Sequence, residues 1–411
     1  MNSLEHNLKA THTAYILYMV YMVSFFLHIP ARIPVLGMLR IDLLLVLFIF
    51  TLVVKVKLSN EPNSKISTYI LALFIYALLA APFATWPGTV IGRGLPNLIK
   101  AGIFFFFTYK IILNEPRLKT MVYLFVFLNT FRVCEALFLN VVFGYWGEKT
   151  YYDGVFVQRL AGSPYDIIGA NGLAFVIATI LPFYHYLFGS KGFFGKVFYL
   201  AMLPICMYSM QLTMSRTGIL AVLIIYAVIF LKSKNKALFI VVGCLGFVGF
   251  MASLDEVQRD RYLSIYSSDA KSSGSAKGRF EGLERDISVG MVKPILGHGL
   301  GTSKEANWNI GGHAQPSHNL WVETFQELGI VGLIIFILYA KEILKGFTQT
   351  NKLMKEGEIS PFLSACQPAM QTWLAMNFLF SFASYGLTSY EWYLFGGFSA
   401  VLARLALSSK T

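Results

Sequence analysis

Apolar runs long enough to cross a membrane are the feature that most constrains this chain. A membrane-spanning helix needs roughly 20 mostly apolar residues, and about twelve such runs can be placed along the sequence. Hydrophobic residues make up 56% of the chain and charged residues 14%, a balance outside the range of ordinary soluble domains. Because backbone polar groups in lipid must bond within their own segment, these runs predict an all-α, polytopic membrane protein. The expected spans lie near 12–29, 34–54, 66–84, 95–113, 119–143, 167–189, 196–213, 217–232, 237–253, 320–340, 365–385 and 390–408.

One connection between the spans, 254–317, is far longer than the others and is expected to carry function. It divides the chain into transmembrane helices 1–9 (residues 1–253), a long outer loop (254–317) and transmembrane helices 10–12 (318–411). Within the loop, four apolar side chains recur at helical spacing: Phe280, Leu283, Ile287 and Met291. They predict an amphipathic helix that lies against the membrane or the helix bundle and ends near Pro294.

Lysine and arginine are unevenly distributed between the loops, which predicts the orientation of the chain. The loops on the N-terminal side are rich in basic residues, whereas the opposite short loops hold few, so both termini are expected to be cytoplasmic. This bias, together with anionic lipid headgroups, accounts for the net charge of +12 without any nucleic acid. The basic residues on the cytoplasmic side are Lys55, Lys57, Lys65, Lys110, Arg117, Lys119, Lys191, Lys196, Lys232, Lys234, Lys236, Lys341, Lys345, Lys352 and Lys355.

Neither the cysteines nor the histidines have the spacing of a metal site or a disulfide framework. The cysteines lie in or beside apolar runs without paired spacing, so they are interpreted as small buried hydrophobic residues. His298, His313 and His318, at gaps of 15 and 5, match no familiar zinc pattern. We therefore expect no metal and no cofactor. The four cysteines are Cys134, Cys206, Cys244 and Cys366.

Several charged residues stand inside or at the ends of the expected spans, in the outer half of the membrane or just beyond it. Such charges are costly and usually face a cavity or a partner. Arg132 and Glu135, three apart on one helix, have the spacing of a mutual pair, and Lys100 is placed to snorkel to the interface. As a set, these charges indicate a basic pocket for an anionic headgroup. The set comprises Arg93, Lys100, Arg132, Glu135, Arg159 and Arg216.

The stretch MSRTGIL (214–220) is expected to form the tight outer turn between the seventh and eighth spans. Arg216 in this turn has two interpretations. In the first, it only marks a helix end and snorkels to the interface. In the second, the turn aims the planar fork of its guanidinium donors at phosphate oxygens.

The stretch QPSHNLWVETFQELGIVGL (315–333) carries polar groups into the start of the tenth span. With a helix that begins near His318, four polar side chains fall on one stripe: Asn319, Glu323, Gln326 and Glu327. A polar stripe at the outer end of a span is typical of a cavity open to the outside. The simpler interpretation is that Ser317 and Asn319 cap the helix and that the glutamates pair with loop arginines. Capping by Ser317 and Asn319 does not explain why a histidine stands at position 318.

These motifs resemble the O-antigen ligase and O-antigen polymerase superfamily of membrane glycosyltransferases. The family's core pattern is a His-Asn pair followed by a helix with Glu-x-Gly-x-x-Gly, and residues 318–332 meet it. Three further stretches resemble family motifs: QRLAGSPYDIIGANGLA (158–174), SRTG (215–218), and GRFEGLERDI leading to KPILGHGLGTS (278–303). The motifs cover residues 159–340, and the remainder of the chain resembles the family only in topology. The resemblance lies closest to lipopolysaccharide O-antigen ligase.

The resemblance implies an enzyme that moves a glycan from undecaprenyl pyrophosphate to a sugar hydroxyl of lipid A core oligosaccharide. It would lie in the bacterial inner membrane with the long loop and the active site facing the periplasm, and it would use no nucleotide sugar. Arg216 and Arg279 would hold the pyrophosphate, with Arg159 a weaker candidate. His318 would orient or deprotonate the attacking hydroxyl, and attack opposite the diphosphate would invert the anomeric centre. The supporting residues are Asn319, Glu323, Glu327, Lys100 and Arg93.

Three functions are compatible with these motifs. A ligase accepts lipid A core, a polymerase accepts a second lipid-linked repeat unit, and a transporter moves the lipid carrier without chemistry. The transporter is disfavoured because it requires polar groups near the membrane midplane, whereas here they crowd the outer half. The single long loop and its basic residues suit the anionic core of lipopolysaccharide and favour the ligase. A related ligase that glycosylates protein also fits the motifs.

Overall fold

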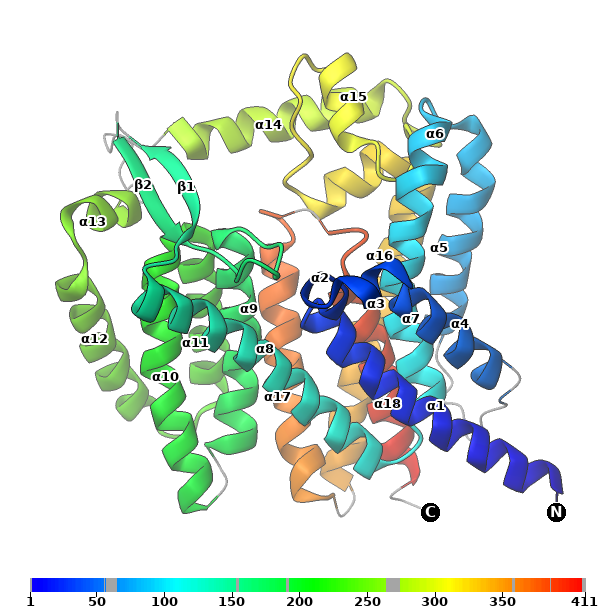
Figure 1. Cartoon of the computed structure of the whole chain (residues 1–411), viewed down its shortest axis with the longest axis horizontal. Coiled ribbons are helices and arrows are strands. Elements are labelled where there is room, and N and C mark those ends of the chain that lie inside the picture. The colour runs from blue at the N-terminus through cyan, green and yellow to red at the C-terminus, as the bar shows by residue number, and fades with distance from the viewer. Residues whose placement is uncertain are drawn as a thin grey trace.

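The computed structural model of the chain is almost entirely helical, which confirms the predicted all-α class (Figure 1). It describes residues 2–54, 56, 65–152, 155–189, 192–263, 274–356, 359–384 and 386–408. The side chains of 2–9, 152, 155, 263 and 274–280 fall outside that description.

The first part of the chain forms one side of a helix bundle and ends with a long helix that crosses its front (Figure 1). Its elements are α1 (Asn2–Phe26), α2 (Ile29–Arg32), α3 (Pro34–Met38), α4 (Ile41–Val53), α5 (Ile66–Ala80), the 3₁₀ turn η1 (Ala81–Phe83), α6 (Pro87–Thr89), the π-helical turn η2 (Val90–Gly94), α7 (Leu95–Ile111) and α8 (Glu115–Phe143). α1 packs against α4, and α5 packs against a later helix, α16 (Leu320–Glu356).

The middle of the chain forms the other side of the bundle. Its elements are the strands β1 (Gly147–Tyr152) and β2 (Val155–Leu160), then α9 (Ala170–Phe183), the π-helical turn η3 (Tyr184–Phe188), α10 (Phe193–Thr213), α11 (Arg216–Lys232), α12 (Lys236–Ser253) and α13 (Glu256–Leu263). α9 contacts α8, α10 and α11, so it lies at the centre of this side.

The last part of the chain ties the two sides together. It comprises α14 (Gly274–Met291), α15 (Ser303–Asn309), α16, α17 (Pro361–Phe380) and α18 (Tyr390–Ser408). α18 packs against α7 and α16 on one side, and α17 packs against α9 and α11 on the other. α14 and α15 lie across the upper end in Figure 1, which we call the α14–α15 end.

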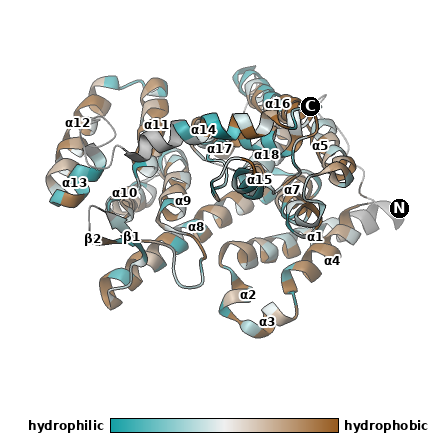
Figure 2. Cartoon of the chain, turned by 90° about the horizontal axis from the view of Figure 1, so that it is seen from above, coloured by the Kyte–Doolittle hydropathy of each residue, from teal (hydrophilic) through white to brown (hydrophobic). Residues whose placement is uncertain are grey.

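Helices with apolar outer surfaces identify the chain as a multi-pass membrane protein. Among the described residues, six helical runs have the length and composition of a membrane span: 66–83, 87–111, 115–143, 170–188, 193–213 and 236–253. Two shorter apolar helices cover 10–26 and 41–53. α12 has no buried residue, and its surface is largely apolar, as Figure 2 shows in brown. Such a surface is suited to contact with lipid. The total of about twelve spans stays a prediction.

The run 34–54 is not the single helix that the sequence predicted. Pro34 begins the short α3, and the chain then turns at Arg40, which has φ +48°, before α4 begins. Proline lacks the amide N–H needed in a helix interior, so Pro30 and Pro34 start short helices instead of continuing a long one. The tenth expected span also differs, because α16 continues to Glu356, well past residue 340.

A β-hairpin that the sequence analysis missed lies between α8 and α9. β1 and β2 pair antiparallel, with Gly147 opposite Leu160 and Tyr152 opposite Val155. The two intervening residues in the sequence are Asp153 and Gly154, a pair typical of tight hairpin turns between β-branched and aromatic residues. That local signal was present in the sequence. The hairpin matters to the site because it carries Arg159.

The amphipathic helix predicted in the long loop is confirmed as α14, which ends three residues before Pro294. Its inward face is not the apolar stripe but a set that includes Asp286, Val289 and Gly290, and the last packs against Phe325 of α16. Ile287 and Met291 point outward, with 42% and 60% of their surface exposed. Of the apolar stripe, Ile287 and Met291 therefore face away from the bundle, Leu283 is half-buried, and the side chain of Phe280 lies outside the described residues.

Candidate functional site

The entrance of α16 is built by a side-chain cap. Asn319 Oδ1 accepts hydrogen bonds from the backbone N–H groups of Trp321 (3.0 Å) and Val322 (3.2 Å). These donors have no partner inside the helix, so the cap stabilises its first turn. The predicted capping is confirmed, with α16 beginning two residues after His318.

α16 is interrupted at Gly329, where the loop that follows α14 enters the helix. Gly329 has φ +65° and ψ −170°, and Ile330 N–H donates to Pro294 O at 2.8 Å instead of to its own helix. The carbonyls freed by the break accept from the same loop, Gln326 from His298 N and Glu327 from Gly299 N, both at 2.9 Å. A Cβ at position 329 would lie 2.1 Å from a backbone oxygen, so only glycine fits.

The two glutamates of the polar stripe bind backbone amides and not arginines. Glu327 is buried, and its carboxylate accepts from Gly301 N (2.7 Å) and Ser303 N (3.2 Å). Glu323 accepts from Gly386 N (2.9 Å) and Leu387 N (3.1 Å). The simpler interpretation, in which the glutamates pair with loop arginines, finds no such pair among the described side chains, which do not include that of Arg279. A carboxylate that receives backbone N–H groups fixes the path of a loop, so these residues shape the α14–α15 end.

His298 belongs to the packing of this loop. Its ring is buried, with Nε2 2.9 Å from Val289 O and Nδ1 3.2 Å from Thr85 Oγ1. Burial lowers the pKa of His298 below its ordinary value, against the smaller opposing effect of the hydrogen bond to Val289. A neutral imidazole with both nitrogens engaged holds α14 to the segment after η1.

His318 lies in the loop between α15 and α16 and is half-buried. Its Nε2 atom is 2.8 Å from Nε2 of Gln315, three residues earlier. Unlike His298, it stands where the loop meets solvent, because Gln315 is exposed. The loop is also tied to the C-terminal part of the chain, where Leu320 N donates to Ser381 O at 2.9 Å.

Arg159 lies on the other side of the bundle, in β2, and only 4% of its surface is exposed. All three of its guanidinium nitrogens are engaged: Nε donates to Thr213 O (2.9 Å), Nη1 to Glu148 (2.7 Å) and Nη2 to Asn171 (2.8 Å). Glu148 also accepts from Ala170 N at 2.7 Å. Arg159 therefore ties the hairpin to the start of α9 and to the end of α10.

Arg216 is the first residue of α11, and the tight turn predicted around it is confirmed. Met214 turns the chain with φ +49°, and Ser215 caps α11 by accepting from Gly218 N at 3.1 Å. Ser215 Oγ also bonds Asn171 Oδ1 at 2.9 Å, so the turn shares a partner with Arg159. Arg216 is half-buried beside this network.

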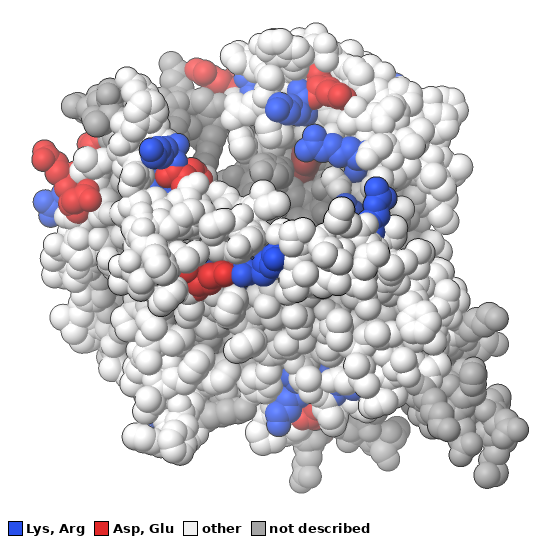
Figure 3. Space-filling model, viewed as in Figure 1, with Lys and Arg blue, Asp and Glu red and all other residues white. Residues whose placement is uncertain are grey.

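The remaining cationic candidates are Arg93, Lys100 and Arg279. Arg93 in η2 and Lys100 in α7 are exposed, and neither forms a hydrogen bond or ion pair with another residue that the structure describes. Arg279 belongs to α14, but its side chain lies outside the described residues. Figure 3 shows a hollow on one face at the α14–α15 end, with both basic and acidic side chains around it.

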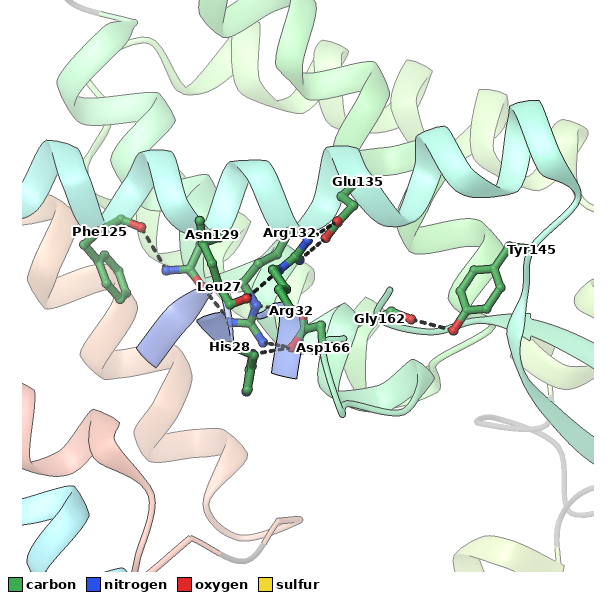
Figure 4. A network of polar contacts seen from close by, with 10 residues as sticks. All are labelled: Leu27, His28, Arg32, Phe125, Asn129, Arg132, Glu135, Tyr145, Gly162 and Asp166. Carbon is green, nitrogen blue, oxygen red and sulfur yellow. Dashed lines mark hydrogen bonds and ion pairs between the residues drawn. The ribbon is translucent and has the colours of Figure 1, made fainter. Parts of the chain in front are cut away.

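Arg132 and Glu135 do not form the mutual pair that their spacing predicted. Arg132 instead donates to both carboxylate oxygens of Asp166, at 2.7 and 2.9 Å, and Glu135 receives Arg32 at 2.6 Å (Figure 4). His28 lies 3.4 Å from Asp166. Sequence analysis missed both partners because they lie 34 and 103 residues away, beyond any local pattern. These two charges hold the bundle together and are not open to a headgroup.

The fold and the site are those of an all-α, multi-pass membrane protein with a polar site assembled from loops at one end of its helix bundle. The family model described as O-antigen ligase, Wzy_C, matches residues 200–337. This match confirms the resemblance to the O-antigen ligase and polymerase superfamily, whose members act on lipid-linked glycans. No curated protein matches the chain. The matched segment includes Arg216, Arg279 and His318, and it excludes Arg159.

Proposed function

We propose that this protein is an O-antigen ligase of the bacterial inner membrane. It transfers O-antigen polysaccharide from undecaprenyl pyrophosphate to a sugar hydroxyl of lipid A core oligosaccharide on the periplasmic side. The observation that carries the proposal is that one O-antigen ligase domain, residues 200–337, contains both the Arg216 turn and the His318 loop. The segment 254–317 is then the periplasmic loop, flanked by transmembrane helices 1–9 and 10–12.

In the proposed reaction the acceptor hydroxyl oxygen attacks the anomeric carbon of the donor. The new glycosidic C–O bond forms as the glycosyl–phosphate C–O bond breaks, and undecaprenyl pyrophosphate leaves with the electron pair. His318 receives the proton of the hydroxyl, because the unperturbed pKa of imidazole lies near working pH. Attack opposite the leaving group inverts the anomeric centre.

Arg216 and Arg279 stabilise the charge that grows on the diphosphate in this reaction. Arg159 acts in support, since its guanidinium is already bonded to Glu148, Asn171 and Thr213 and keeps the Arg216 turn in place. Asn319, Glu323 and Glu327 likewise act by fixing backbone, through the cap and the loop contacts described above. Arg93 and Lys100 are free to meet anionic groups of either substrate.

The sidedness of the site is tested by single-cysteine labelling in a variant that lacks the four native cysteines. Asn309 is exposed in α15, and Lys234 is exposed in the turn between α11 and α12. In cells with a permeabilised outer membrane, an impermeant thiol reagent should label Asn309→Cys and spare Lys234→Cys. The reverse pattern would place the site in the cytoplasm and contradict the proposed reaction.

The alternative within the same family is an O-antigen polymerase, which joins lipid-linked repeat units. The eight Lys and Arg residues of 254–317 are matched by eight Asp and Glu residues, so the ligase is favoured by the single long loop and not by its net charge. The lipopolysaccharide of a deletion strain separates the two. Complete loss of O-antigen from the core indicates the ligase, whereas core that carries single repeat units indicates the polymerase. A purified enzyme that joins donor to rough lipopolysaccharide would establish the reaction directly.

A further inference from the structure

A buried polar cluster holds the loop that carries His318. Asn307 in α15 donates through Nδ2 to Asp286 Oδ1 of α14 (2.8 Å) and to Gln315 O of the loop (2.7 Å). Its Oδ1 atom accepts from Gln326 Nε2 of α16 at 2.6 Å. Asp286 is 3% exposed, and Asn307 and Gln326 are fully buried. Three helices therefore meet at Asn307, and the loop is attached to that point.

Among the side chains that the structure describes, the buried carboxylate of Asp286 has no close cation. Arg285 Nε lies 4.0 Å away, at the limit of an ion pair. Burial raises the pKa of Asp286, while hydrogen bonds from Ser317 and Asn307 and the charges of Arg285 and His318 act in the opposite direction. A buried anion with incomplete compensation is costly. A positive charge on His318 would compensate it.

A contact with Gln315 also fixes the orientation of the His318 imidazole. Gln315 Nε2 is a donor, so the His318 Nε2 atom that it meets at 2.8 Å accepts and carries a lone pair. In the neutral ring the proton is then on Nδ1. Nε2 is the atom able to accept a proton from a hydroxyl; its one lone pair is occupied by Gln315, so the acceptor hydroxyl has to take the place of the Gln315 amide.

We propose that Asp286 is a positioning residue for His318: through Asn307 it fixes the backbone of Gln315, and its charge stabilises the imidazolium that forms during transfer. This inference rests on the proposed function, in which His318 is the base. When the acceptor oxygen bonds to the anomeric carbon, its proton moves to His318 Nε2, and the donor diphosphate leaves. Asp286 stays ionised throughout and exchanges no proton.

The test compares Asp286→Asn with Glu284→Gln, which makes the same charge change on an exposed position of the same helix. Transfer is measured with purified enzyme, lipid-linked donor and rough lipopolysaccharide across a pH series. Asp286→Asn should shift the acidic limb of the rate to lower pH, because loss of the anion lowers the pKa of His318. On the plateau above the acidic limb the rate should fall by roughly tenfold or more, with donor affinity unchanged. Glu284→Gln should leave rate and profile unchanged.

A double-mutant comparison separates positioning from general stabilisation. If Asp286 acts through His318, Asp286→Asn should reduce transfer in the native background and add nothing in His318→Ala. An equal reduction in both backgrounds, or a uniform loss with no shift of the pH limb, would overturn the inference and leave the proposed function intact. Full transfer by His318→Ala would instead overturn the assigned base.

If Asp286→Asn does not fold, Gln315→Ala provides a second test of the inference. Gln315 is exposed, so its removal should leave thermal stability unchanged. It should shift the acidic limb of transfer to higher pH in the native background, because a donor to Nε2 favours the neutral ring, and it should have no effect in His318→Ala. The charged groups around the cluster are Asp286 and Arg285 from α14 and Glu323 from α16. Unchanged transfer by Gln315→Ala would show that the contact with His318 has no function.

Discussion

The turn that carries Arg216 and the loop that carries His318 are held in opposite ways. On the Arg216 side, the buried guanidinium of Arg159 binds the carbonyl of Thr213 and draws the turn toward the hairpin. On the His318 side, the buried carboxylates of Glu323 and Glu327 bind backbone N–H groups. One region is organised around a guanidinium group and the other around buried carboxyl groups.

The difference has a direct electrostatic consequence. A diphosphate is stabilised near guanidinium groups, whereas a base that gains a proton is stabilised near carboxylates. The two regions therefore suit the two substrates of a transfer reaction, with the donor near Arg216 and the acceptor near His318. The following predictions test whether each region can be disabled without the other.

The largest effect is expected at His318. His318→Ala should reduce transfer by about 10²–10⁴-fold, the usual contribution of a general base, while lipid-linked donor still binds. His313→Ala, an exposed histidine of the same loop, is the matched control and should leave transfer unchanged. Transfer and donor binding are measured on the same detergent preparations. If transfer and donor binding fell in equal proportion, His318 would belong to the donor side. The two regions would then no longer serve different substrates.

Gly329→Ala should disrupt the His318 side through the backbone. The positive φ and the contact with Ile295 leave no room for a Cβ. Such strain costs on the order of 1–3 kcal/mol before any clash is counted. Yield and thermal stability in detergent should fall, whereas Gly246→Ala, which meets nothing within 4 Å, should behave as the native protein. A stable Gly329→Ala protein would mean that the loop need not enter α16.

On the donor side, Lys should not replace Arg216. Lysine keeps the charge but loses the planar fork. Because charge-assisted bonds contribute about 1.5–3 kcal/mol, transfer should fall roughly tenfold or more, with weaker donor binding. Arg279→Lys is expected to behave in the same way. Arg259→Lys, exposed on α13, is the control. Near-native transfer in Arg216→Lys would reduce that residue to a general electrostatic role.

The smallest effect concerns acid stability of the α14–α15 end. Because burial lowers the folded-state pKa of His298, the unfolded chain binds more protons as the pH drops below about 6.5. Stability should therefore be complete above that pH and decline below it. Thermal unfolding in detergent at neutral pH and at about pH 5 measures the decline. His298→Gln should show a smaller pH dependence, and an unchanged one would exclude His298 as its source.

Local patterns predicted much of the fold and part of the site. The helix near Pro294, the turn at Arg216 and the cap at Asn319 depend on residues within a few positions of one another, so the sequence displays them directly. The hairpin also had a local signal in the sequence, where Asp153 and Gly154 separate two stretches of β-branched and aromatic residues.

The sequence by itself determined that this chain is an all-α membrane protein with the motifs of one family, because hydrophobic runs and motif spacing are local properties. Only the tertiary structure decided how its polar groups are used. Arg132 binds Asp166 and not Glu135, Glu327 holds a loop and not an arginine, and Asp286 reaches the His318 loop through Asn307. The partners in these contacts are separated along the chain, and a buried charge is satisfied by whichever partner the packing brings within hydrogen-bond distance.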